Sequence, residues 1–385
     1  MNSPIKTNKV KRIAIDASHV PDKPLGAGKY VFELIKNLDS LQKDSSQKGT
    51  EKLEFHIITR SNDAARWVEL NKNNSLRIHP VAPISKIKRL IWEQTKAKKF
   101  VAENEIDLWH STHYTYPSKV GCEVVVTIHD LTFFTHPQFH QKFKVYFFRY
   151  MIKKSVKKAN KLICVSESTK TDLMKHFPIS KDKVTTIYLG VDSKINSDVK
   201  EPQETPYKNE KYFSFVGLHE PRKNIEFLIK AFKLVSLKEP DTKLILGGAT
   251  GWKVSGMKKL ISQLELEEKV MLPGHIPGAQ LESFMNNSIA FIYPSIKEGF
   301  GLPALEAVKS GTVCITSRNT SMEEICGDTA IYINPNDVDD LSSQMISLTS
   351  PATRKKVLAE LQNNISENFY PTWTECTKNH LKIYS

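Results

Sequence analysis

The sequence predicts an α/β protein with two doubly wound parallel sheets, one in each half of its 385 residues. Short apolar runs, typical of buried parallel strands, alternate with amphipathic helical runs in both halves. The length suits two domains of about 180 residues each better than a single core. Charge divides the same way: residues 1–200 hold 35 Lys and Arg against 20 Asp and Glu, whereas residues 201–385 hold 20 against 22.

In the first half, a glycine-containing loop at 26–28 and an amphipathic helix over 30–38 follow the first strand. The strands are expected at 12–16, 55–59, 123–128 and 161–165. Polar or helical segments separate them, as in a sheet covered on both faces.

In the second half, a helix over 225–237 is expected to follow the first of six strands. The strands are expected at 212–216, 243–246, 270–272, 290–293, 313–316 and 330–333. A polar stretch with Pro202 and Pro206 precedes them and indicates an interdomain linker. The resulting division is a first domain at 1–195, a linker at 196–209, a second domain at 210–370 and a terminal segment at 371–385.

Composition narrows the class of protein. No run approaches the roughly 18 apolar residues of a membrane span, and residues 1–11 lack the apolar core of a secretory signal. The five cysteines show no zinc spacing, so we expect a reduced, cytoplasmic protein. The net charge of +13 indicates an anionic partner, but no nucleic-acid-binding module is recognisable.

The most informative segment is Glu298–Ala307, EGFGLPALEA, in which Glu298 and Glu306 stand eight positions apart. An apolar run at 289–295 precedes it, and Pro303 suits the first turn of a helix. The segment therefore predicts a strand, a loop with Glu298 and a helix with Glu306. Free amides at a helix start favour an anion, and carboxylates accept hydrogen bonds from hydroxyls. A nucleotide sugar offers both groups.

A second segment, Val216–Asn224 or VGLHEPRKN, leaves a strand at Gly217 and brings Arg222 and Lys223 to a helix start. The guanidinium fork and the ammonium group suit phosphate oxygens. The alternative is a pair of solvated surface cations.

The first half offers weaker candidates. His129 follows an apolar strand, at the end where such sheets bind ligands. The Gly26–Gly28 loop matches neither the P-loop nor the dinucleotide fingerprint, because Lys23, Tyr30 and Val31 break the patterns. A plain strand-to-helix turn is the alternative there. No third ligand accompanies His110 and His113, so no metal site is expected.

The two glutamates and the Arg-Lys pair resemble the E-x7-E and G-x-x-x-x-R-K-N elements of the retaining glycosyltransferases of family 4. The resemblance covers nearly the whole chain. Within the family, the sequence is most similar in pattern to mannosyltransferase-like members. It implies the GT-B architecture of two Rossmann-like domains facing a cleft, with the acceptor on the first domain and the nucleotide sugar on the second. It also implies that the helix within 371–385 crosses back to the first domain, and that no metal or other cofactor is required. In the segment Ser317–Gly327 the sequence departs from the family pattern, since Glu323 replaces a proline.

The resemblance also assigns roles. Arg222 and Lys223 would hold the donor diphosphate, while Glu306 binds the ribose and His129 bonds to the donor sugar across the cleft. The leaving phosphate would remove the acceptor proton on the same face. Two loop glycines, Gly28 and Gly217, would lie at the ligand. The residues implied to hold the transferred sugar are Glu298, Gly299, Phe300, Gly301 and Leu302.

Two basic segments, Lys86–Trp92 and Phe143–Lys154, mix cations with large apolar residues. Such helices either lie on an anionic membrane or pack their apolar faces on the sheet. The expected function is transfer of a mannose-like hexose to a glycan or lipid-linked acceptor in cell-envelope polysaccharide assembly, on the inner face of the membrane. The alternatives are a GT-B epimerase or phosphorylase, a non-catalytic nucleotide-sugar-binding membrane protein and, last, a nucleic-acid binder.

Overall fold

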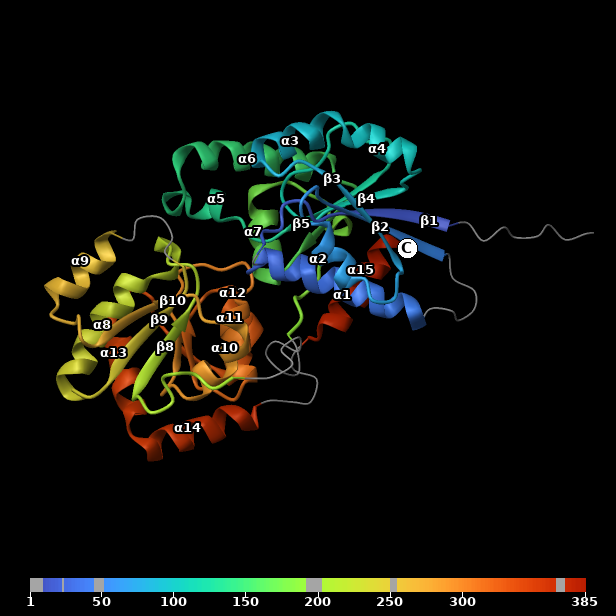
Figure 1. Cartoon of the computed structure of the whole chain (residues 1–385). Helices are drawn as coiled ribbons and strands as arrows, with labels where there is room; N and C mark the ends of the chain where they lie inside the picture. Colours follow the sequence, from blue (N-terminus) through green and yellow to red (C-terminus); the bar gives the residue numbers. More distant parts are fainter. Residues whose placement is uncertain (1–9, 23, 45–51, 192–202, 250–254, 365–370) are drawn as a thin grey trace, which may run out of the picture. The chain divides into compact units, whose positions relative to one another are not determined.

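The structure is a computed structural model that describes residues 10–22, 24–44, 52–191, 203–249, 255–364 and 371–385 (Figure 1). The chain forms two compact units. Unit 1 contains residues 1–190 together with 373–385, and unit 2 contains residues 191–372.

Unit 1 is built on a seven-stranded, wholly parallel sheet in the order β3-β2-β1-β4-β5-β6-β7. Its strands are β1 Val10–Asp16, β2 Lys52–Arg60, β3 Leu76–Ala82, β4 Leu108–Ser111, β5 Glu123–Ile128, β6 Lys161–Cys164 and β7 Val184–Thr186. Its helices are α1 Ala27–Asp44, α2 Ala64–Leu70, α3 Lys86–Thr95, α4 Ala97–Glu103, α5 Thr132–Thr135, α6 Lys142–Lys158, α7 Glu167–His176 and α15 Trp373–Tyr384.

Unit 2 is built on a six-stranded parallel sheet in the order β10-β9-β8-β11-β12-β13. Its strands are β8 Tyr212–Val216, β9 Lys243–Gly247, β10 Val270–Gly274, β11 Phe291–Tyr293, β12 Cys314–Ser317 and β13 Ile331–Ile333. Its helices are α8 Ile225–Lys238, α9 Ser255–Gln263, α10 Gly278–Asn286, α11 Leu302–Lys309, α12 Ser321–Cys326, α13 Val338–Thr349 and α14 Pro351–Asn363.

The prediction of two parallel α/β sheets is confirmed, and every expected strand is present. Their central residues are buried on both faces, which explains why these strands are continuous apolar runs. In each sheet the strand order reverses once, between β1 and β4 and between β8 and β11. Ligands of doubly wound sheets bind outside the carboxyl ends of the strands at such a reversal.

Three strands of unit 1 were not predicted. They are the two edge strands, β3 and β7, and the central strand β4, which has only four residues, LWHS. β3 reads LRIHPVA, and its Pro80 and polar residues are tolerated because an edge strand has an unpaired side. β7 has three residues, too few to show a period. Of the expected linker, residues 196–202 lie outside the described residues. The remaining linker residues belong to unit 2, where the amide of Gln203 donates to the carbonyl oxygen of Ala279 on α10 at 2.9 Å.

The last helix of the chain, α15, belongs to unit 1 and packs against α1. His380 and Tyr384 on α15 are fully buried. The Nδ1 of His380 donates to the carbonyl oxygen of Cys376 at 2.8 Å, so its Nε2 accepts from the hydroxyl of Tyr30 at 2.8 Å.

This arrangement fixes the direction of a buried hydrogen-bond chain. The Tyr30 oxygen must accept from Thr127, at 3.1 Å, and the Thr127 oxygen accepts from Nε2 of His110, at 2.9 Å. Nδ1 of His110 then accepts from the hydroxyl of Tyr384 at 2.7 Å. In this hydrogen-bond chain, each ring nitrogen of His110 and His380 is therefore either a donor or an acceptor. One donor and one acceptor per ring require both histidines to be neutral.

No described helix is long and apolar enough to span a bilayer. All five cysteines are free thiols, and Cys164 and Cys314 are buried in β6 and β12.

Acidification is expected to destabilise unit 1. Burial lowers the pKa of His380 to about 4 and the pKa of His113 to about 3, below the value of about 6.5 in an unfolded chain. The unfolded state therefore binds more protons as the pH falls below about 6.5, and the stabilisation present above that pH is lost. For His380 alone the loss is about 2 kcal/mol at pH 5. Thermal unfolding followed between about pH 7.5 and pH 5 measures it.

Two variants identify the source of this pH dependence. His380→Gln retains a hydrogen-bonding side chain but not the titration, so its melting temperature should vary less with pH than that of the wild type. His176→Gln, at an exposed position on α7, is the matched control. A melting temperature that does not fall between about pH 7 and pH 5 would contradict the assignment.

Candidate active site

Two loops meet at the strand reversal of unit 2. The loop after β8 contains Gly217 and Arg222, and the loop after β11 contains Glu298. The amide of Ile296 donates to the carbonyl oxygen of Arg222 at 3.0 Å, which ties the second loop to the first. The most informative motifs of the sequence therefore come together where a doubly wound sheet binds its ligand.

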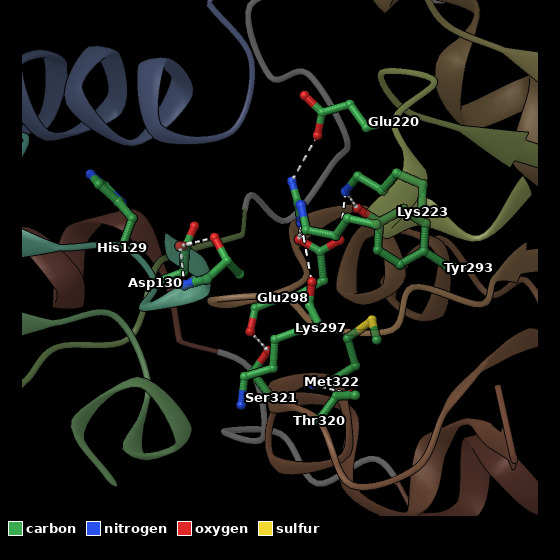
Figure 2. Close-up of polar contacts among 12 residues, drawn as sticks. His129, Asp130, Glu220, Lys223, Tyr293, Lys297, Glu298, Thr320, Ser321 and Met322 are labelled. Carbon is green, nitrogen blue, oxygen red and sulfur yellow. Dashed lines mark hydrogen bonds and ion pairs between the residues drawn. The ribbon is translucent and has the colours of Figure 1, made fainter. Parts of the chain in front are cut away.

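Glu298 bridges the two cations of the first loop (Figure 2). Its Oε2 accepts from the guanidinium of Arg222, and its Oε1 accepts from Nζ of Lys223 at 2.6 Å. Lys223 also donates to the hydroxyl of Tyr293, at the end of β11. Lys223 and Glu298 are 7% exposed, so the cluster is largely withdrawn from water.

The charges of the cluster depend on one another. Burial alone would raise the pKa of Glu298, but Arg222 and Lys223 outweigh it and hold the pKa near 2. Burial, followed by repulsion from Arg222, lowers the pKa of Lys223 to about 8 even though Glu298 opposes the shift. Burial and the charge of Glu298 raise the pKa of Tyr293. At neutral pH the carboxylate is charged, the phenol is neutral and the lysine is still mostly protonated.

Backbone conformation directs these side chains. After β8 the chain makes a 3-10 turn over Pro221–Lys223, and Asn224 follows with a left-handed backbone, φ +58°. The Asn224 amide group donates to the carbonyl oxygen of Pro335 at 2.8 Å, which fixes the turn. A Cβ at Gly248 would lie 1.8 Å from the carbonyl oxygen of Gly217, so the two backbones touch there.

The second loop is equally constrained. The hydroxyl of Ser321 donates to the carbonyl oxygen of Glu298 at 2.9 Å (Figure 2). Gly301 precedes α11 with φ +105°, and a Cβ there would lie 2.5 Å from Cγ of Met322. α11 then begins at Leu302 with Pro303 in its first turn, as the sequence predicts.

The other residues predicted to bind the sugar donor lie in this loop or on α11, which follows it. Gly299 lies in it, Phe300 and Leu302 are buried, and Glu306 is buried on α11, one turn beyond Leu302. Arg222, Lys223 and Glu298 are thus joined by direct bonds. Glu306 belongs to the same loop and helix, and Gly217 lies beside Lys223, whose Cε would be 3.9 Å from a Cβ at that glycine.

His129 and Gly28 belong to unit 1. His129 follows β5, and its Nε2 donates to the carbonyl oxygen of Thr112 at 2.9 Å. The neutral ring, whose pKa is lowered by burial, therefore presents Nδ1 as an acceptor. Gly28 is in the first turn of α1, where a Cβ would lie 3.2 Å from Cβ of Pro24.

Other polar residues of unit 1 have a structural role or bear on the question of a metal site. Asp130 accepts from the amide and hydroxyl of Thr132 at 2.9 and 2.6 Å and so orders the start of α5. Among the described residues no group of three His, Cys, Asp or Glu is arranged to hold a metal. The ring nitrogens of His19 and Nδ1 of His113 have no hydrogen-bond partner within the described parts of the chain. His19 follows β1 by three residues, and no sequence pattern singled it out.

Glu220 and Tyr293 were also missed. Glu220 lies 3.4 Å from NH2 of Arg222 and competes with any anion at that guanidinium (Figure 2). Tyr293 ends the strand before Glu298. A strand-terminal tyrosine is common in cores, so only its contact with Lys223 reveals its place in the site.

Comparison with known proteins identifies the family of this chain. The family model described as Glycosyl transferases group 1 matches residues 196–370, and the model of Glycosyltransferase Family 4 matches residues 25–194. Together they leave only residues 1–24, 195 and 371–385 unmatched. The chain belongs to the family 4 glycosyltransferases, and its two parallel α/β units are the domains of the GT-B fold.

Individual relatives narrow the comparison. The O-antigen chain mannosyltransferase B of Escherichia coli is 28% identical over 72% of this chain and 74% of its own length. The O-antigen chain mannosyltransferase RfbU of Salmonella typhimurium is 32% identical over 59% of this chain and 60% of its own length. The structure of Anabaena HepE in complex with UDP and glucose is similar with a TM-score of 0.71, at 16% identity over 97% of this chain and 99% of HepE.

Gly301→Ala is expected to damage the loop that holds Glu298. The new Cβ meets Met322 and the backbone has a positive φ, so the free energy of unfolding should fall by at least about 2 kcal/mol. Thermal unfolding measures the loss of stability, and a transfer assay measures the damage to the loop that holds Glu298. Gly121→Ala is the matched control, because a Cβ at Gly121 meets nothing within 4 Å. Equal stability of the two variants would contradict the constraint.

Proposed function

We propose that this glycosyltransferase moves a mannosyl or related hexosyl group from a nucleoside diphosphate sugar to a glycan or lipid-linked acceptor, with retention of the anomeric configuration. The observation that carries the proposal is the bridge from Glu298 to Arg222 and Lys223 at the strand reversal of unit 2. It places two cations beside one carboxylate in a nearly dry site.

The two cations suit the diphosphate of the donor. Negative charge grows on the phosphate oxygens as the glycosidic bond breaks, and preorganised cations in a desolvated site stabilise that charge. Arg222 supplies a planar fork and Lys223 a point charge. Because two fixed cations serve this purpose, we expect transfer without a metal ion.

The remaining residues suit the sugar and the ribose. Glu298 and the backbone of Gly299–Leu302 are proposed to hold the transferred hexose, and Glu306 the ribose hydroxyls. Nδ1 of His129 is proposed to accept a hydrogen bond from a sugar hydroxyl. Gly28 and Gly217 are proposed to let the backbone approach the ligand closely.

The electrostatics of Glu298 bear on the mechanism. A carboxylate with a pKa near 2 is a poor general base at neutral pH. Two cations also draw electron density from its oxygens, which weakens it as a nucleophile. We therefore propose that the leaving phosphate takes the proton of the acceptor hydroxyl while that oxygen attacks the anomeric carbon from the same face. The new glycosidic bond forms as the bond to phosphate breaks, and the nucleoside diphosphate leaves.

The choice of sugar and acceptor comes from the relatives. Two O-antigen mannosyltransferases are 28% and 32% identical to the chain, which supports mannosyl transfer in the assembly of a cell-envelope polysaccharide. Such an enzyme would work in the cytoplasm, at the inner face of the membrane.

Glu298→Gln should lower the transfer rate at least about 100-fold, because it removes the charge that orders the cations in the transition state. Glu220→Gln is the matched control, since it removes the other carboxylate near Arg222 but not the bridge. It should retain transfer and bind the nucleoside diphosphate up to about fivefold more tightly, because a partly exposed ion pair contributes at most about 1 kcal/mol. Initial rates and calorimetric titration measure the two effects. Equal rates for both variants would refute the role of Glu298.

A thermal-shift screen with EDTA tests donor binding. GDP, UDP, ADP, dTDP and their sugar conjugates are compared, with GDP-mannose and UDP-glucose first. One nucleotide family should raise the melting temperature by mass action, and Arg222→Ala should weaken that binding about tenfold or more. A shift that appears only without EDTA would overturn metal independence. No shift with any nucleotide would contradict the proposed donor class.

A further inference from the structure

Two helices of unit 1 turn apolar side chains to solvent. α3 and α6 lie along the same side of the unit (Figure 1), and Nζ of Lys154 on α6 donates to Oε1 of Gln94 on α3 at 3.3 Å. The seven exposed residues of this α3–α6 surface are between 37% and 74% exposed. They are Ile84, two residues before α3, Ile87 and Ile91 on α3, and Phe143, Tyr146, Phe147 and Tyr150 on α6.

On α6 the exposed residues form a stripe. Phe143, Tyr146, Phe147 and Tyr150 are spaced by three, one and three positions, which places them on one face of a helix. The opposite face packs into the core of unit 1 through Ile152 and its neighbours. The helix is therefore apolar on both sides, although only one side has a partner within the described residues of unit 1.

Buried polar residues on the inward face of α3 explain the orientation of this helix. Arg89 and Glu93 are buried and paired at 3.1 Å, and Glu93 also accepts from the hydroxyl of Thr115 at 2.8 Å. Breaking a buried, hydrogen-bonded ion pair is costly, so these contacts fix the rotation of the helix. Ile87 and Ile91 then have to face outward.

The charges on this surface have one sign. α6 contains seven cations and no acidic residue, and the single acid of α3 is the buried Glu93. Lys86 and Lys88 on α3 and Lys142 on α6 are exposed beside the isoleucines and aromatic residues. Self-association through this surface would bring like charges together, whereas anionic lipid headgroups complement it.

We infer that the α3–α6 surface binds an anionic lipid bilayer, with the aromatic and isoleucine side chains in the headgroup region and the lysines on lipid phosphates. Exposed apolar residues ringed by cations are typical of helices that lie in a membrane interface, and tyrosine is enriched there. The inference depends on the proposed function only in that a lipid-linked acceptor is found at a membrane. Lipid binding requires neither donor nor acceptor, so it can fail separately from the transfer reaction.

Sedimentation with vesicles tests the inference on the full chain. The wild type should bind vesicles of phosphatidylcholine and phosphatidylglycerol, bind pure phosphatidylcholine at least about tenfold more weakly, and lose affinity as salt is added. Phe143→Ser with Tyr146→Ser should weaken binding about tenfold or more. The matched control, Val68→Ser with Leu237→Ser, removes two side chains of similar exposure on α2 and α8 and should bind like the wild type.

Charge variants separate the lysines from overall charge. Lys142→Glu with Lys144→Glu should weaken vesicle binding at least about 25-fold, from about fivefold per lysine. Lys355→Glu with Lys356→Glu makes the same change on α14 and should have much less effect. The inference is overturned if the wild type does not bind the anionic vesicles, or if each surface variant binds like its control. It is also overturned if the wild type is a dimer that Phe143→Ser with Tyr146→Ser converts to a monomer.

Discussion

The candidate active site depends on one carboxylate shared between two cations. Glu298 opposes the effect of burial on the pKa of Lys223, and Arg222 and Lys223 in turn keep Glu298 ionised. None of the three is stable alone there, because an unpaired buried charge costs several kcal/mol. The cluster is therefore a single electrostatic unit, and the loops after β8 and β11 are held in register by it as well as by their backbone bonds.

This mutual dependence links stability to chemistry. The interactions that let Glu298 remain buried also lower its basicity, which removes it as a proton acceptor at neutral pH. The proposed transfer of the acceptor proton to the leaving phosphate follows from that constraint. Glycines complete the arrangement, since Gly301 must adopt a positive φ beside Met322 and Gly217 must touch Gly248. Neither Gly301 nor Gly248 has room for a larger residue.

Unit 1 uses polar burial in a different way. Neutral histidines, tyrosines and a threonine join α15 to β4, β5 and α1 through hydrogen bonds whose direction is fixed. On α3, the buried pair Arg89–Glu93 turns isoleucines outward. In both places buried polar groups specify the orientation of a helix, and on α3 the consequence is an exposed apolar surface.

The sequence by itself determined the two parallel sheets, because strands buried on both faces must be continuous apolar runs separated by helical periods. It also determined the loop residues Arg222, Lys223 and Glu298, since their segments adjoin strands and match a family pattern. It missed the edge strands β3 and β7 and the four-residue central strand β4, because their polar or short sequences carry no period. Only the tertiary structure revealed that Glu298 bonds to both cations, that Glu220 and Tyr293 join them, and that the apolar residues of α6 face outward. Those facts depend on contacts between residues as many as 76 positions apart, which no local pattern encodes.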